Sequence, residues 1–344
     1  VRLWGDFPVI TTVADDITSE NIDEVYPQYF PKQNTELEAY QQIEKDLLDA
    51  VLYAPDNTPG NKTLFTKSVA RTLLAKIYAE KPLRDYTKVI QYCDEVKADG
   101  FDLVDDFSDL FGMNAAGTDA KMRNTKESIL EAQFTSGAGN WCTWMFGRDL
   151  VNWNNNFTWA KWVTPSRDLI SAFKQEGDEV RFKESIVYYD CNWSNYYPSD
   201  NYPFMYKCRS ANSSIIKYRY ADVLLLKAEA LIMQDTPDLE GAADIIDKVR
   251  DRAKLGALPT SVRSNKNAML NALLKERRLE LAFEGQRWFH LVRLDKVEEV
   301  MNAVYAKDSG RKAQIYTFDK NSYRLPIPQS VIDANDKIHQ NPGY

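Results

Sequence analysis

The sequence predicts a mainly α-helical fold in which paired helices carry long irregular loops and a few short strands. Apolar residues recur every three or four positions over several long segments, which is the spacing of an amphipathic helix. Two such segments, about 66–99 and about 218–253, each hold two helices joined by a short turn, close to the ~34 residues of one tetratricopeptide repeat. We therefore expect tetratricopeptide-like helix pairs arranged as an α–α superhelix.

The first helical region is expected over residues 34–100. Its opening helix has apolar residues in 3-4-3 spacing at Tyr40, Ile43, Leu47 and Ala50. Two further helices follow, with apolar stripes at Val69, Leu73 and Ile77, and at Tyr86, Ile90 and Cys93. Pro82 stands between these two stripes, and it marks the turn because proline cannot continue a regular helix.

The second helical region is expected over residues 218–300. Its first two helices have apolar stripes at Tyr218, Ala221, Leu225, Ala228 and Ile232, and at Leu239, Ala242, Ile246, Val249 and Ala253. Between them, Thr236 is a candidate cap and Pro237 suits the first position of the second helix. A third helix is expected from about residue 267 to about residue 284, where Gly285 would end it.

The segment between the helical regions and the tail after them are irregular. Residues 101–217 are rich in Gly, Asn, Asp, Ser and Pro, although 128–134 has the pattern of a strand. Loops this long in a compact protein are usually functional, so this segment is the expected ligand-binding insertion. The tail, residues 301–344, holds three prolines and is expected to pack without forming one regular helix.

Composition and charge exclude several classes of function. The 344 residues carry a net charge of −7, with lysines and arginines scattered among acids, so no nucleic-acid-binding tract is present. Only two histidines occur, which excludes a histidine-rich zinc site, and no phosphate-binding glycine loop is found. No run approaches the ~20 apolar residues of a membrane helix. We expect no cofactor and no metal site.

The four cysteines form no CxxC pair. In a chain of this length we expect free thiols, with a disulfide between Cys191 and Cys208 as the alternative.

A row of acidic residues stands near the end of the second helical region. Glu276, Glu280 and Glu284 are four residues apart and would repel one another on a helix unless they were paired. The expected partners are Arg277, Arg278 and Arg287, in a buried ionic network that serves packing. The alternative, a pair of carboxylates for glycoside hydrolysis, would require two acids facing one cleft.

Aromatic residues give the main functional signal. Five of the eight tryptophans fall within residues 141–162, and another follows among Tyr188, Tyr189, Tyr196 and Tyr197. A tryptophan face can stack on the apolar face of a sugar, while asparagine and arginine can hydrogen-bond its hydroxyls. The alternative is that these tryptophans form a core beneath the loops. The predicted ligand-binding residues are Trp141, Trp144, Arg148, Trp153, Asn154, Asn155, Trp159 and Trp193.

Several motifs along the chain resemble those of the SusD/RagB family. Residues 217–230 read KYRYADVLLLKAEA, and residues 243–253 read ADIIDKVRDRA. Residues 275–293 read KERRLELAFEGQRWFHLVR, and the terminus, residues 325–344, is similar to the family's C-terminal end. The opening residues 1–9 resemble the segment that follows the family's first helices. The departures are His290 where the family usually has Asp, Ser330 where an acid is common, and Asp336 where Pro is common.

The resemblance implies a single SusD-like domain over residues 1–344 that corresponds to the C-terminal two-thirds of the family pattern. It implies a non-catalytic protein that binds an oligosaccharide at the bacterial outer surface. It also implies a partner, a SusC-like TonB-dependent β-barrel transporter, and an outer-membrane location through an N-terminal lipid anchor that is absent from this sequence. The family belongs to Bacteroidetes-like bacteria, and no nucleic-acid partner is implied.

Three alternative functions remain open at this point. Some family members capture peptides, although the density of aromatic residues favours a glycan. A helical-repeat scaffold that docks a protein partner would be expected to lack the long insertion at 101–217. A glycoside hydrolase is the enzymatic alternative, and it would need the paired carboxylates discussed above.

Overall fold

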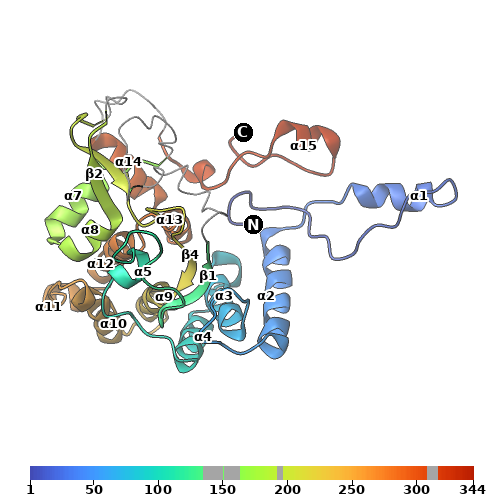
Figure 1. Ribbon diagram of the computed structural model, residues 1–344. Helices are drawn as coiled ribbons and strands as arrows, with labels where there is room; N and C mark the ends of the chain where they lie inside the picture. Colours follow the sequence, from blue (N-terminus) through green and yellow to red (C-terminus); the bar gives the residue numbers. More distant parts are fainter. Residues whose placement is uncertain (135–149, 151–162, 192–196, 308–316) are drawn as a thin grey trace. The chain divides into compact units, whose positions relative to one another are not determined.

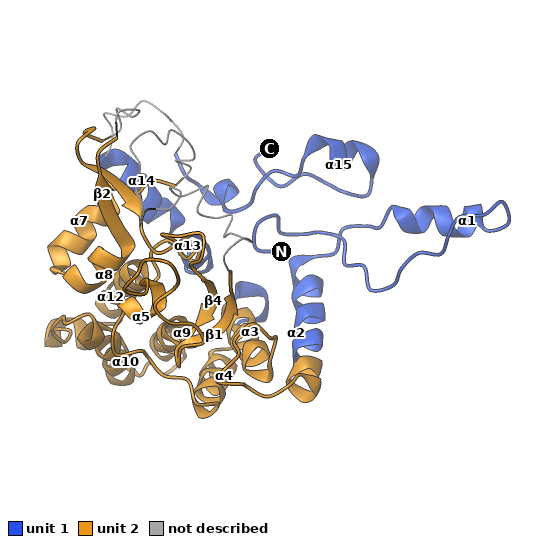
Figure 2. Cartoon of the chain, viewed as in Figure 1, with its two compact units in different colours: residues 1–47, 80–84, 288–344 blue, residues 48–79, 85–287 orange. Residues whose placement is uncertain are grey.

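The computed structural model describes residues 1–134, 150, 163–191, 197–307 and 317–344 (Figure 1). The chain divides into two compact units (Figure 2). Unit 1 comprises residues 1–47, 80–84 and 288–344, and unit 2 comprises residues 48–79 and 85–287. Unit 2 contains the paired helices and the described part of the loop-rich segment.

The two predicted helix pairs of unit 2 are confirmed. The first consists of α3 (Lys67–Ala79) and α4 (Tyr86–Ala98), and the second of α9 (Tyr220–Met233) and α10 (Leu239–Arg252). Helix α4 also packs against α9, so the two pairs form one continuous helical layer, and α12 (Lys266–Glu280) packs against both α9 and α10. The fold is therefore mainly α-helical, as expected.

Small residues allow the second pair to pack closely. Ala228 on α9 and Ala242 on α10 are both fully buried. An alanine side chain lets two helix backbones approach, and a larger residue at either place would overpack the contact.

The ends of two helices differ from the sequence predictions. Helix α10 is capped by Asp238, whose side chain accepts a hydrogen bond from the backbone N–H of Gly241 at 2.9 Å, and not by Thr236. Asp238 directly precedes the first helical residue, which is where a capping side chain can reach the free N–H groups. Helix α12 ends at Glu280, four residues before the predicted end, and Phe283 and Gly285 then both adopt positive φ, at 65° and 73°.

The loop-rich segment contains short regular elements. These are α5 (Ser108–Phe111), β1 (Ser128–Ala132), α7 (Arg167–Glu176), α8 (Glu179–Ser185), β2 (Ile186–Tyr189), β3 (Tyr202–Met205) and β4 (Ile215–Arg219). The predicted strand at 128–134 is confirmed as β1, which pairs antiparallel with β4. Strands β2 and β3 form a second antiparallel pair. The short helix α11 (Thr260–Arg263) precedes α12.

Unit 1 joins the beginning of the chain to its end. Its elements are α1 (Ile22–Val25), η1 (Tyr26–Tyr29), most of α2 (Glu36–Tyr53), η2 (Lys81–Leu83), nearly all of α13 (Arg287–Arg293), α14 (Val297–Lys307), η4 (Lys320–Tyr323) and α15 (Gln329–Ala334). The backbone N–H of Leu325 donates to the carbonyl of Leu3 at 2.8 Å, and the Asn341 amide donates to the carbonyl of Trp4 at 3.0 Å. The tail therefore packs as irregular chain with short helical turns, as expected.

Within the described parts of the chain, no helix is both long enough and apolar enough to cross a bilayer.

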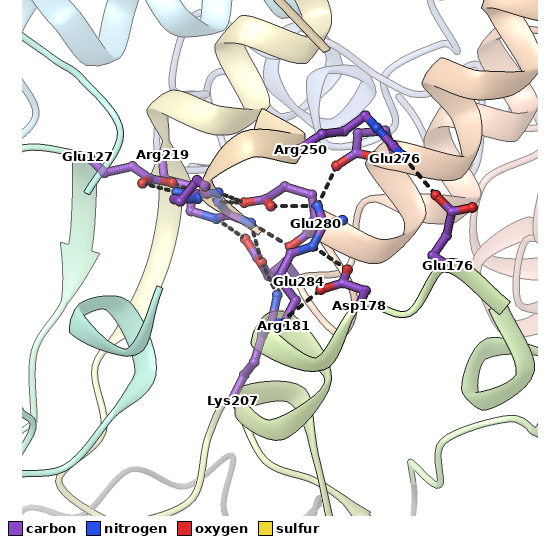
Figure 3. Close-up of polar contacts among 11 residues, drawn as sticks. Glu127, Glu176, Asp178, Arg181, Lys207, Arg219, Arg250, Glu276, Glu280 and Glu284 are labelled. Atoms are coloured by element: carbon purple, nitrogen blue, oxygen red, sulfur yellow. Dashed lines mark hydrogen bonds and ion pairs between the residues drawn. The ribbon is translucent and has the colours of Figure 1, made fainter. Parts of the chain in front are cut away.

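A buried ionic network holds unit 2 together around α12 (Figure 3). Glu280 is fully buried and accepts hydrogen bonds from three arginines: Arg181 on α8, Arg219 at the end of β4, and Arg252 on α10. Arg219 also bonds Glu127 at 2.7 Å and Glu284 at 2.8 Å. The prediction of a buried structural network is confirmed.

The predicted partners within this network were wrong. Arg277 donates to Asp222 at 2.5 Å, Arg278 donates to Asp168 at 2.6 Å, and Arg287 donates to the backbone carbonyl of Leu274 at 2.8 Å. Arg277 and Arg278 follow Glu276 on α12 and point about 100° and about 200° away from it around the helix axis, towards Asp222 of α9 and Asp168 of α7. Arginines from other elements fill that role, and the network therefore fixes tertiary contacts.

Candidate functional site

An open depression lies in unit 2 beside α7 and strand β2. Figure 1 shows where α7 and β2 lie in the fold. Its volume is about 460 Å³. The lining combines two tyrosines with basic and uncharged polar side chains: Arg167, Ile170, Ser171, Lys174, Gln175, Tyr188, Tyr197, Pro198 and Asn201. This mixture of aromatic faces and hydrogen-bonding groups makes it the best-supported ligand site among the described residues.

Helix α7 provides one wall of the depression. Ser166 caps its start by accepting from the backbone N–H of Leu169 at 3.1 Å, and Gly177 ends it with a φ of 68°, a conformation that glycine adopts without steric cost. Its inner face buries Leu169, Ile170 and Phe173 in an apolar cluster. Another face of α7 lines the depression. It presents Arg167, Ser171 and Lys174, which are four and three residues apart and so lie on one side of the helix.

Strand β2 and the loop between β2 and β3 provide the other wall. Alternate residues of a strand point to opposite faces, so Ile186 and Tyr188 pack on the cluster beneath α7, while Val187 and Tyr189 pack on a second cluster. The Tyr188 ring lies 6.4 Å from the Phe182 ring. This alternation is what places Tyr188 at the depression.

Tyr197 is held in place from three directions. Its hydroxyl donates to the carbonyl of Pro165 at 2.7 Å, and its ring meets the Tyr202 ring edge-to-face at 5.7 Å between centroids. The guanidinium of Arg167 lies 4.8 Å from the centre of the Tyr197 ring, which is a cation–π distance. The ring is therefore fixed before any ligand arrives, so little side-chain entropy would be lost on binding.

Several polar groups at the depression are available to a ligand. Across the described residues, no hydrogen bond engages the hydroxyl of Tyr188, the side-chain amide of Asn201 or the ammonium of Lys174. Burial raises the pKa of Tyr188, so its hydroxyl stays protonated near neutral pH and can donate. The depression thus offers both donors and acceptors around an apolar floor.

The acidic residues of α7 are engaged elsewhere. Asp168 pairs with Arg278 of α12 at 2.6 Å, and Glu176 pairs with Arg250 of α10 at 2.8 Å and also with Lys275. Helix α8, which leads directly into β2, is attached to the same region because Arg181 bonds Asp178, Glu276 and Glu280. These ion pairs hold both walls of the depression on α12.

The predicted ligand-binding residues lie outside the described residues. They are Trp141, Trp144, Arg148, Trp153, Asn154, Asn155, Trp159 and Trp193. Leu150, which stands between Arg148 and Trp153 in the sequence, is described and is fully buried. Its carbonyl accepts from the hydroxyl of Tyr189 at 2.6 Å, and it packs with Tyr202 and Phe204. Leu150 is therefore attached to the β2–β3 pair.

Sequence reasoning found only part of this depression. Tyr188 and Tyr197 belong to the aromatic group noted after residue 141, but the polar residues of α7 and Asn201 were not identified. A signal for them did exist, because Arg167, Ser171 and Lys174 repeat at helical spacing opposite an apolar stripe. It was hidden within a segment whose composition suggested loop.

Two further sequence predictions concern metal and thiol chemistry. In the described ranges, no group of three or more His, Cys, Asp or Glu side chains could hold a metal ion. Cys93 and Cys191 are buried free thiols, so the alternative of a Cys191–Cys208 disulfide was wrong, and Cys142 lies outside the described residues. Burial raises the pKa of Cys93, which keeps this thiol protonated and unreactive.

Fold and site together define a class: a tetratricopeptide-like helical scaffold that carries a loop-rich insertion with an open, tyrosine-lined depression. A family model described as the SusD family matches residues 197–344. The SusD-like protein P2 of Formosa agariphila is 28% identical over 393 residues, an alignment that covers all of this chain and 71% of the relative. The chain is therefore similar to a SusD-like protein along its whole length, and its C-terminal part, residues 197–344, matches the model of the SusD family.

Solved structures show the same fold. A SusD homolog from Bacteroides thetaiotaomicron superposes with a TM-score of 0.74 at 22% identity, covering 100% of this chain and 75% of the other. A laminarin-binding SusD-like protein superposes with a TM-score of 0.71 at 24% identity, again covering 100% of this chain and 75% of the other.

Proposed function

We propose that this protein captures an oligosaccharide or polysaccharide at the bacterial cell surface and does not cleave it. The observation that carries the proposal is the depression between α7 and the β2–β3 pair, with its two tyrosine rings and uncommitted polar groups. A sugar ring has an apolar C–H face and a rim of hydroxyls. An aromatic ring can cover the face, while amide, hydroxyl and ammonium groups bond the rim.

The family relationship supports this proposal and extends it. A solved relative of the same fold is described as a laminarin-binding SusD-like protein. By the same relationship, we propose delivery of the captured glycan to a SusC-like TonB-dependent transporter in the outer membrane, with the binding protein held at the surface by a lipid anchor. Similarity to the family is the support for both of these steps.

The absence of a carboxylate pair at the depression favours binding over hydrolysis. Glycoside hydrolysis requires two acids on either side of the scissile bond. Among the described residues, the lining of the depression contains neither Asp nor Glu. Glu276, Glu280 and Glu284 are instead bonded to arginines and lysine inside unit 2, where no substrate reaches them.

Replacing Tyr188 by alanine is expected to weaken glycan binding about tenfold, because the variant loses one aromatic face and one hydroxyl. Tyr188→Phe keeps the ring and should lose less. Titration calorimetry against a panel of plant, host and microbial glycans measures both variants. Tyr53→Ala is the matched control, since Tyr53 is 83% exposed on α2 and lies outside the depression. Unchanged affinity in Tyr188→Ala would exclude this depression as the site.

We propose that the tryptophan-rich segment supplies the rest of the site through Trp141, Trp144, Arg148, Trp153, Asn154, Asn155, Trp159 and Trp193. The contacts of Leu150, which stands between Arg148 and Trp153 in the sequence, with the β2–β3 pair support this extension. Trp153→Ala and Trp144→Ala are each expected to reduce glycan affinity roughly tenfold, by loss of a stacking face. Tryptophan fluorescence titration provides the readout, and wild-type affinity in both variants would contradict the assignment of this segment.

A further inference from the structure

We propose that the pocket between α4, α9 and α10 is a second ligand site, which takes a small neutral aromatic molecule with one hydroxyl group. The pocket lies in the helical scaffold of unit 2, and its lining shares no residue with the depression beside α7. Its volume is about 170 Å³. The basis of the proposal is a buried tyrosine in this apolar pocket whose hydroxyl makes no hydrogen bond to the described residues.

The walls of the pocket are regular helices. Helix α9 packs against both α4 and α10, and Figure 1 shows it between them. Val223 and Leu224 stand three and four residues after Tyr220 on α9, so the three side chains share the face that forms the floor. Cys93 of α4 and Ile245 of α10 complete the apolar lining. The pocket is therefore formed by the scaffold before any ligand binds.

The size and the floor of the pocket suit one aromatic ring. Val223 and Cys93 are each 2% exposed and Leu224 is 7% exposed, so the floor is buried and apolar. An engineered apolar cavity of roughly 150 Å³ in another protein binds benzene. A ring of this size can pack against the Tyr220 ring and the Cys93 sulfur, and both contacts favour aromatic partners.

The hydroxyl of Tyr220 is the polar group that a ligand would meet. Tyr220 is 1% exposed, and within the described ranges no hydrogen bond engages its hydroxyl. The Cys93 thiol, in contrast, donates to the carbonyl of Val223 at 3.5 Å. Burial, together with the charge of Asp102, raises the pKa of Tyr220, so its hydroxyl stays protonated and can donate. A ligand oxygen that accepts this hydrogen bond would satisfy a buried donor.

The charges around the pocket favour a neutral ligand. Three ion pairs engage charged residues of the lining: Lys227 with Asp94 at 2.5 Å, Lys248 with Asp102 at 2.6 Å, and Asp244 with Arg263 at 3.2 Å. Lys97, the remaining charged residue of the lining, is exposed to water. A charged ligand would lose hydration and would meet both signs of charge, whereas a neutral hydroxyl can bond Tyr220 without either cost.

The test uses 4-methylphenol, toluene and benzoate as probes. Toluene lacks only the hydroxyl of 4-methylphenol, and benzoate is an anion of similar size. Nuclear magnetic resonance of the ¹⁵N-labelled protein measures affinity and location together. We expect saturable binding of 4-methylphenol with a dissociation constant of about 1 mM or lower, and at least tenfold weaker binding of benzoate. The shifted amide signals should belong to α4, α9 and α10.

Replacing Tyr220 by phenylalanine isolates the hydroxyl. The variant should bind 4-methylphenol about fivefold more weakly, through loss of one buried hydrogen bond, and its affinity for toluene should change less than about twofold. Tyr53→Phe is the matched control, since Tyr53 is 83% exposed on α2 and does not line the pocket. Its affinities for both probes should equal those of wild type.

A second variant fills the pocket. Ile245→Trp should weaken binding of both 4-methylphenol and toluene at least tenfold, because the larger side chain occupies the space of the ligand. Leu52→Trp is its control, because Leu52 is 66% exposed on α2, outside the pocket. Thermal unfolding of each variant verifies that the fold is retained.

The outcomes concern this pocket and not the capture of a glycan. Equal effects of Tyr220→Phe on 4-methylphenol and toluene overturn the role of the hydroxyl, and tighter binding of benzoate overturns the preference for a neutral ligand. Shifts confined to α7 and β2 overturn the location. No saturable binding of either ring compound overturns the site, and the occupant would then be sought in an apolar side chain of a protein partner.

Discussion

Glu280→Gln is expected to lower the free energy of unfolding by about 3–5 kcal/mol, the usual effect of removing one partner from a buried ion pair. Glu280 is fully buried and bonds Arg181, Arg219 and Arg252. The neutral amide of glutamine cannot balance the positive charges of these three arginines. Its N–H₂ group would also face arginine N–H groups, which donate hydrogen bonds and cannot accept them. Since domains are typically stable by about 5–15 kcal/mol, the variant should be close to unfolding at room temperature.

Urea denaturation followed by circular dichroism measures this effect. The control is Glu240→Gln, because Glu240 is exposed and bonds Arg263 at the surface, where an ion pair contributes about 0–1 kcal/mol. A loss of less than 1 kcal/mol in Glu280→Gln would show that the network does not stabilise the fold. Glycan binding by any folded fraction should be unchanged, since Glu280 does not line the depression.

Acidification from pH 4.5 to pH 3 is expected to destabilise the wild type more than Glu280→Gln. Burial alone would raise the pKa of Glu280, but Arg252, Arg219 and Arg181 hold it well below its usual range. Burial also acts to raise the pKa of Glu284, but the positive charges of Arg219 and Lys207 outweigh it, so the pKa of Glu284 is lowered. The stabilisation from such carboxylates is complete above the pKa of the unfolded chain and is lost as pH falls towards their folded pKa values.

The comparison between the two proteins reports mainly on Glu280. Burial raises the pKa of Glu276 and of Asp178, and the charge of Glu280 raises both further, so their opposition to the acid effect is smaller in the variant. For each carboxyl group whose pKa is lowered, stability changes by at most about 1.4 kcal/mol per pH unit. Denaturation midpoints at several pH values should give a steeper slope for the wild type. Equal slopes would mean that Glu280 does not remain ionised in the folded protein.

Local patterns in the sequence were sufficient to predict the helical scaffold. The apolar stripes at Val69–Ile77 and Leu239–Ala253 have helical period, and each lies on a helix that buries that stripe. The turn at Pro82 and the strand beginning at Ser128 were also identified, because proline chemistry and strand composition act over only a few residues. The positions of the helix ends were predicted less accurately. Asp238 and Thr236 are both good caps, and only the tertiary contacts of α10 decide where the helix begins.

The sequence by itself determined the helix pairs, the buried role of the acidic row and the aromatic character of the insertion. The tertiary structure decided which arginines meet Glu280, since Arg181, Arg219 and Arg252 come from α8, β4 and α10, 28 to 99 residues away along the chain. The tertiary structure also determined where the depression forms, because α7 and β2 meet there on a shared apolar cluster. Periodicity reports which side of an element is buried, whereas a site depends on which elements are brought together, and that choice is made by long-range packing.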